Sequence, residues 1–253
     1  MIPSSTVLVT GSAGRIGKAA VAELQARGRP VRGFDRVPTP GLEDHVVGEI
    51  TDRSALDRAM AGVTTLIHLA ATPDDVDDVL KDLFPPNIVG VYHVLEAART
   101  AGVKRLILAS SGQVVWYQRL TGPWPIGVDV QPTPRLWYAA TKVFLEAAGR
   151  AYAEAYGMSV LAVRLGWCPR TPEQVQETAA SDWAQTVYLS PKDAGRFFVC
   201  AVDAPETPRF AVVYATSKPK RTPLVDLKPA KELLGFEPQE SWPEGTEVVL
   251  QGQ

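Results

Sequence analysis

The most constraining feature of this sequence is a strand-like run that ends in a glycine loop and leads directly into a helix. Residues 6–10 are rich in β-branched side chains, and residues 15–27 carry apolar side chains at helical spacing. Between them lies the run Gly11-Ser12-Ala13-Gly14-Arg15-Ile16-Gly17. A strand, a tight turn and a helix in this order predict a βα unit, and such a unit can present backbone N–H groups to an anionic ligand.

The same alternation continues through about two thirds of the chain. Further strands are expected at 31–34, 46–50, 65–69, 105–109 and 160–165, and helices at 54–61, from Asn87 to Gly102 and at 136–156. Repeated units of this kind predict a parallel sheet covered by helices on both faces. After Cys168 the regularity fades, with a helix near 191–202, a strand near 210–214 and a proline-rich tail. We expect one folding unit, in which residues 169–253 form a small substrate-binding lobe.

Charge and composition exclude several classes of partner. The net charge is −2 and no run of lysines or arginines occurs, so neither nucleic acid nor an anionic membrane is an expected partner. The two cysteines are too few for a disulfide framework or a metal knuckle, and no metal site is expected. No apolar run reaches the length of a membrane span, and the start of the chain lacks a signal-peptide pattern. We therefore expect a soluble, cytoplasmic protein.

The glycine loop predicts a dinucleotide cofactor. Gly11 permits the tight turn, Gly14 lets the backbone approach a pyrophosphate, and Gly17 lets the helix pack on the sheet. A glycine-rich turn without a ligand is the alternative, but the preceding strand and following helix favour the cofactor. Asp35 ends the second strand, where a carboxylate binds the adenosine ribose and repels a 2′-phosphate, so NAD is expected rather than NADP. The neighbouring Arg36 could instead face a phosphate.

Three further residues suit proton transfer at a carbinol oxygen. Tyr138 and Lys142 are four residues apart on a predicted helix and therefore share one face. A nearby ammonium is expected to lower the pKa of the phenol, which favours its use as a base. Ser111 follows the fifth strand at its carboxyl end, where ligands bind in open parallel sheets. A surface ion pair and a simple turn cap are the alternatives when each motif is taken alone.

In combination, these motifs resemble the extended short-chain dehydrogenase/reductase superfamily, in its epimerase/dehydratase branch. The resemblance covers roughly the first two thirds of the chain. It implies a Rossmann-type doubly wound sheet, an NAD-binding domain at 1–168 and a catalytic trio of Ser111, Tyr138 and Lys142. Cofactor contacts are expected from Gly11, Ala13, Gly14, Arg15, Ile16, Gly17, Asp35, Arg36, Glu49, Ile50, Leu69, Ala70, Ala71, Asn87, Tyr138, Lys142 and Cys168. Substrate contacts are expected from Thr72, Ser111, Gly112, Gln113 and Trp167.

Within the branch, the sequence is most similar to uronate dehydrogenases, which oxidise a free sugar acid with NAD. The substrate residues depart from that group: Gly112 and Gln113 replace an asparagine and a histidine, and Trp167 replaces a serine. The stretch 171–190, where the group keeps an arginine for the uronate carboxylate, has no arginine or lysine. A buried carboxylate without a cation is poorly compensated, so a uronate needs Arg119, Arg135 or Arg170 as a substitute.

Three functions follow from these observations. The first is an NAD-dependent oxidoreductase acting on a small sugar, sugar acid or related alcohol or carbonyl compound. The second is a nucleotide-sugar epimerase or dehydratase that keeps NAD tightly bound, and the third is a cofactor-binding protein without catalysis. The complete serine, tyrosine and lysine set argues against the third. The resemblance also implies a homodimer that pairs the helices near 87–100 and 136–156.

Overall fold

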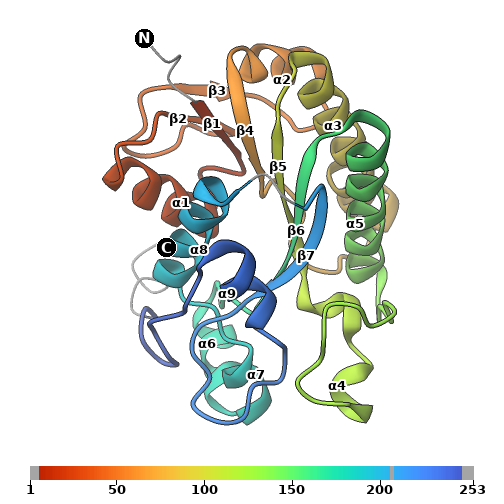
Figure 1. Cartoon of the computed structure of the whole chain (residues 1–253), viewed down its shortest axis with the longest axis vertical. Helices are drawn as coiled ribbons and strands as arrows, with labels where there is room; N and C mark the ends of the chain where they lie inside the picture. Colours follow the sequence, from red (N-terminus) through yellow and green to blue (C-terminus); the bar gives the residue numbers. More distant parts are fainter. Residues whose placement is uncertain (1–5, 206–207, 247–253) are drawn as a thin grey trace.

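Seven parallel strands form the central sheet, as the alternating pattern predicts. The computed structural model describes residues 6–205 and 208–246. Its strand order is β3-β2-β1-β4-β5-β6-β7 (Figure 1). The strands are β1 (Thr6–Thr10), β2 (Val31–Asp35), β3 (His45–Val47), β4 (Val63–His68), β5 (Arg105–Ser111), β6 (Ser159–Leu165) and β7 (Phe210–Ala215). The order reverses between β1 and β4, and ligands bind at the carboxyl ends of strands at such a reversal.

Helices cover both faces of the sheet, which makes the fold a Rossmann-type three-layer α/β structure (Figure 1). One face carries α1 (Arg15–Ala26), α8 (Pro191–Asp203) and α9 (Lys228–Leu234), and the other carries α2 (Arg53–Met60), α3 (Gly90–Ala101) and α5 (Trp137–Tyr156). Successive strand residues point to opposite faces, so Leu8 packs in one core and Val9 in the other, both fully buried. Burial on both faces explains why the strands read as continuous apolar runs.

The third strand is shorter than the predicted span 46–50. The ladder ends at Val47, and residues 48–50 turn toward α2, whose first turn is capped by the Asp52 side chain. At Gly48 an added Cβ would lie 2.8 Å from the Ala55 Cβ, so only glycine allows this approach. Ile50 then packs inward against Gly90 of α3. This local packing, and not the apolar pattern, sets the end of the strand.

Residues after 168 divide between the sheet and a lobe at its carboxyl edge. The helices α6 (Pro172–Ala179) and α7 (Asp182–Thr186) lie within the stretch for which the sequence predicted no regular structure. Thr171 and Ser181 cap them, so capping signals were present although the apolar pattern was weak. The helix α4 (Gln118–Thr121) lies beside them beyond the strands (Figure 1). In contrast, β7 pairs with β6 and α8 packs on α1, which extends the main domain.

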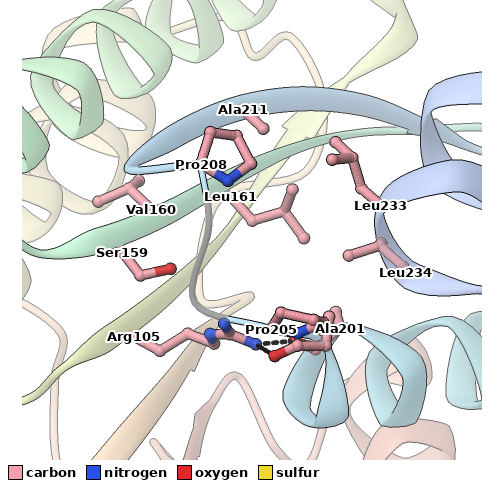
Figure 2. A pocket seen from close by; sticks show the side chains of 11 residues that line it. Arg105, Ser159, Val160, Leu161, Ala201, Pro205, Pro208, Ala211, Leu233 and Leu234 are labelled. Carbon is pink, nitrogen blue, oxygen red and sulfur yellow. Dashed lines mark hydrogen bonds between the residues drawn. The ribbon is translucent and has the colours of Figure 1, made fainter.

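A small cavity lies at the opposite, amino-terminal edge of β5, β6 and β7 (Figure 2). Its volume is about 20 Å³, enough for a single water molecule. Leu161, Leu233 and Leu234 line it, and Arg105 donates a hydrogen bond of 3.0 Å to the Ala201 carbonyl (Figure 2). The arginine anchors α8 to the sheet, and the cavity is too small for an organic ligand.

Candidate active site

A cavity of about 1150 Å³ opens at the carboxyl edge of the sheet, over the reversal between β1 and β4. It exceeds the usual size of a small-molecule site, so it has room for a dinucleotide and a small substrate together. All the predicted site residues except Asn87 line it, from the glycine loop to Ser111, Tyr138 and Trp167. The structure therefore brings together residues that the sequence separates by more than half of the chain.

The glycine loop owes its composition to close backbone packing. Gly11 has a φ of +71°, and a Cβ there would lie 2.7 Å from the Ala70 backbone nitrogen. A Cβ at Gly17 would lie only 2.0 Å from the Gly11 carbonyl oxygen. At Gly14, which precedes α1, the nearest such contact is 3.1 Å, and no side chain within the described residues caps the helix. The amino end of α1 is thus left open toward the cavity, as anion binding requires.

Arg15, on the first turn of α1, gives independent support for an anionic ligand. Its three guanidinium nitrogens are buried and have no hydrogen-bond partner among the described residues. Burial raises the pKa of the Cys168 thiol to about 11, and the positive charge of Arg15 partly opposes this rise. A buried guanidinium without a carboxylate is costly, so a bound pyrophosphate would suit this position. The residues present fit a dinucleotide.

Asp35 stands at the end of β2, where the sequence predicts a contact to the adenosine ribose. Its carboxylate accepts hydrogen bonds from the backbone N–H of Ala13 at 3.0 Å and from that of Arg36 at 2.7 Å. These contacts hold the negative charge beside the glycine loop, within the cavity lining. The Arg36 side chain is exposed. The Asp35 carboxylate therefore lies at the carboxyl end of β2, beside the glycine loop.

Tyr138 and Lys142 lie on the first turns of α5 and are buried beside Ser111. The Lys142 ammonium is 5.7 Å from the centre of the Tyr138 ring and donates a hydrogen bond of 2.9 Å to the Ala109 carbonyl. Burial lowers the pKa of Lys142 to about 8. Burial also raises the pKa of Tyr138 to about 12, although a hydrogen bond from Ser111 opposes the rise. The expectation of a lowered phenol pKa is therefore wrong for the protein alone, because desolvation outweighs the nearby charges.

Asn87 does not line the cavity, but its side chain fixes the loop around Thr72, which does. It lies in the second of two π-helical turns, Val79–Leu83 and Pro85–Val89, that precede α3. Its side chain accepts from the Thr72 backbone N–H at 2.8 Å and donates to the Thr72 carbonyl at 3.0 Å. Asp75, in the same loop as Thr72, accepts a hydrogen bond of 2.9 Å from the Tyr138 backbone N–H and so caps α5. This long-range cap has no local sequence signal.

A buried polar network that sequence reasoning missed lies behind the proton-transfer residues. Glu146 accepts a hydrogen bond of 2.6 Å from the Ser110 hydroxyl and pairs with both Nε and Nη2 of Arg164, at 2.9 and 3.0 Å. Ser110 and Arg164 are partners across β5 and β6, and Glu146 is four residues after Lys142 on α5. Because strand side chains alternate, the Ser110 hydroxyl is directed to this network and the Ser111 side chain to the other face, and both residues border the cavity. The network fixes α5 to the strand that carries Ser111.

Only some of the aromatic residues near the site segments belong to the cavity. Trp116, Trp167 and Trp183 line it. Trp124 and Trp137 are more than half exposed, and Tyr117 is also exposed. Neither a helix long and apolar enough to cross a membrane nor a group of three metal-binding side chains occurs in the part of the chain that the structure describes.

Comparison with known proteins shows the family to which the chain belongs. Residues 7–168 match the model of the NAD dependent epimerase/dehydratase family, which is more than half of the chain. The L-arabinose 1-dehydrogenase (NAD(P)(+)) of Haloferax volcanii is 31% identical, over 93% of this chain and 96% of its own length. The NAD-dependent glucose-6-phosphate dehydrogenase of the same organism is 29% identical, over 95% of each chain.

Solved structures show the same relationship. A mutated uronate dehydrogenase superposes with a TM-score of 0.78 and 29% identity, over 98% of this chain and 86% of the other. The chain therefore belongs to the NAD-dependent epimerase/dehydratase family, and its similarity to uronate dehydrogenases, predicted from the sequence, is confirmed.

Proposed function

We propose that this protein is an NAD-dependent dehydrogenase that acts on the hydroxyl or carbonyl group of a small sugar or sugar derivative. The observation that carries the proposal is the shared cavity, in which Ser111, Tyr138 and Lys142 line the same space as the open end of α1. The relatives named for arabinose, glucose 6-phosphate and uronate oxidation support a sugar substrate.

The chemistry divides between cofactor and protein. When bound, NAD⁺ accepts a hydride from the carbinol carbon of the substrate. The Tyr138 hydroxyl, as phenolate, takes the proton from the carbinol oxygen, so the alcohol becomes a carbonyl and one proton is released. The Ser111 hydroxyl donates a hydrogen bond to the same oxygen and orients it. The Lys142 ammonium, close to the ring, stabilises the phenolate form.

A nucleotide-sugar epimerase or dehydratase is the second candidate, and the composition of the lobe argues against it. The lobe stretch 171–190 carries Glu173, Glu177 and Asp182 but no lysine or arginine. Arg170, just before it, already pairs with Asp74 at 2.9 Å. This stretch therefore offers no cation of its own to a second diphosphate.

The test is a substrate panel in which the absorbance of reduced cofactor is followed. Free aldoses, uronic acids, sugar phosphates, simple alcohols and nucleotide sugars are each incubated with NAD⁺ or with NADP⁺. We expect a free sugar or sugar derivative to give NADH. We also expect NAD⁺ to exceed NADP⁺ in kcat/KM by about tenfold or more, because ~1.4 kcal/mol of repulsion from Asp35 corresponds to a factor of ten. Epimerisation of a nucleotide sugar without net NADH would reverse the assignment.

A further inference from the structure

One wall of the cavity consists of two arginines and two tryptophans. The Arg119 guanidinium carbon lies 4.0 Å from the centre of the Trp116 ring and 4.5 Å from that of Trp183. Arg135 lies 5.2 Å from the Trp116 ring centre, and the two tryptophan rings meet edge to face at 5.5 Å. All four side chains line the cavity that holds Tyr138. Segments that precede and follow α5 in the sequence therefore form one cationic, aromatic wall of the cavity.

Within the part of the chain that the structure describes, no carboxylate neutralises the positive charge of this wall. No carboxylate lies within 4 Å of Arg119 or Arg135 among residues 6–205 and 208–246. The Nε atom of Arg119 and the Nε1 atom of Trp183 are buried, and neither has a hydrogen-bond partner in the described structure. Burial and the charge of Arg135 both lower the pKa of Arg119. Two like charges and two unused donors thus face the same space, and an anion would satisfy them.

We propose that Arg119 and Arg135 form an anion subsite that binds a carboxylate or phosphate group of the sugar substrate. The proposal rests on the proposed dehydrogenase function and narrows its substrate to an acidic sugar. The Arg119 guanidinium packs against both indoles, whose ring centres are 5.5 Å apart on neighbouring sides of it, and its buried Nε has no partner among the described residues. Its N–H groups can therefore donate hydrogen bonds to the oxygen atoms of an anion. A neutral hydroxyl could use the donors but would leave the charge uncompensated.

Of the three arginines that the sequence offers as substitutes for a lobe cation, Arg119 and Arg135 form this wall, whereas Arg170 pairs with Asp74 at 2.9 Å. Residues 171–190 lack the arginine expected for a uronate carboxylate, and the residue that α7 contributes to this wall is Trp183. The cations come instead from the segment after Ser111, which passes through the turn Gly112–Val115 to α4. The anionic end of the substrate would then contact this wall, while its reacting hydroxyl or carbonyl group lies at Ser111 and Tyr138.

Paired substrates and matched variants test the proposal. Glucose, glucuronate and glucose 6-phosphate differ at one end only, and kcat/KM is measured for each with NAD⁺. We expect the wild type to prefer at least one acidic sugar over glucose by about tenfold or more. Arg119→Gln should lower kcat/KM for that acid by about ten- to hundredfold and change the value for glucose by about twofold or less. Arg150→Gln is the control, because Arg150 is exposed and stacks on Phe210 at 4.3 Å outside the cavity.

A binding measurement separates this proposal from the proposed function. Calorimetric titration of the NADH-bound protein with the three sugars requires no turnover. Binding of glucuronate or glucose 6-phosphate that Arg119→Gln weakens and Arg150→Gln does not would support the subsite even if no sugar is oxidised. The acid that binds more tightly identifies the anion as carboxylate or phosphate.

A second variant, Arg135→Gln, keeps the test valid if Arg119→Gln fails to fold. Arg135 is exposed, so its replacement leaves the core unchanged. It should weaken binding of the same acid, though less than the change at Arg119. Equal binding of glucose and both acids by the wild type would overturn the proposal. Unchanged binding of the acids in both arginine variants would overturn it as well.

Discussion

At the residue scale, the reactivity of Tyr138 depends on a competition between burial and charge. Burial raises its pKa to about 12, and Asp74 and Asp75 add to the rise, whereas Ser111 and Arg170 lower it. The neutral phenol therefore dominates at physiological pH in the protein alone. Oxidation of an alcohol needs the phenolate, and reduction of a carbonyl needs the phenol.

This competition predicts different pH dependences for oxidation and for reduction. As the pH rises toward a pKa that is above the assay range, the phenolate fraction increases about tenfold per pH unit. We expect log kcat/KM for oxidation to rise with pH between about pH 6 and about pH 8, and kcat/KM for reduction to stay nearly constant. Initial rates with saturating cofactor check this. A flat oxidation profile over that range would contradict the role of Tyr138 as base.

Single residues also show what the sequence could and could not predict about the site. The positions of Gly11, Gly17 and Asp35 beside the cavity were predictable from local sequence. Close backbone packing requires the two glycines, and Asp35 directly ends a strand. Asp75 and Glu146 were not, because their partners, Tyr138 and Ser110, are distant in sequence. Nothing in a linear pattern indicates that an aspartate in one loop caps a helix in another part of the chain.

At the element scale, α3 and α5 leave an apolar surface exposed on the outer face of the molecule. Tyr92 on α3 is 56% exposed, and Phe144 and Tyr156 on α5 are 38% and 53% exposed. Large apolar side chains gathered on two adjacent helices are typical of a protein interface. We propose that two copies of the chain pair through these helices.

The pairing predicts a homodimer at micromolar concentration. Light scattering should give twice the mass of the chain, which is 27.4 kDa. Phe144→Glu would place a charge within the interface and should shift the population toward monomer. Arg150→Glu is the matched control, because Arg150 is a second exposed position of α5 and stacks on Phe210 of β7. A monomer for the wild type would count against the proposal.

Elements with strong periodicity were predicted well. The helix expected at 136–156 is observed at Trp137–Tyr156, and the strand expected at 105–109 extends to Ser111. The helices α4, α6, α7 and α9 were missed because each has only four to eight residues and a weak apolar pattern. The third strand was overestimated because its apolar end, Ile50, packs on Gly90 instead of continuing the ladder.

At the scale of the whole molecule, the cavity has two walls of different origin. The cofactor wall follows from one βα unit and the reversal of the sheet, both of which the sequence pattern indicates. The substrate wall depends on contacts between Trp116, Arg119 and Trp183, which belong to separate segments around α5. The family was therefore accessible from the sequence, whereas the contacts that bring Arg119 together with the two tryptophans were not.

The most direct test of the central claim is the turnover of Tyr138→Phe. The change removes only the phenolic oxygen, so NAD⁺ binding by calorimetry should stay within about twofold of wild type. The rate of NADH formation from the preferred sugar should fall by about a hundred- to ten-thousandfold, the usual contribution of a general acid–base group. Loss of turnover with intact NAD⁺ binding is the result that we predict. Equal turnover in variant and wild type would contradict the assignment of Tyr138 as the proton-transfer residue.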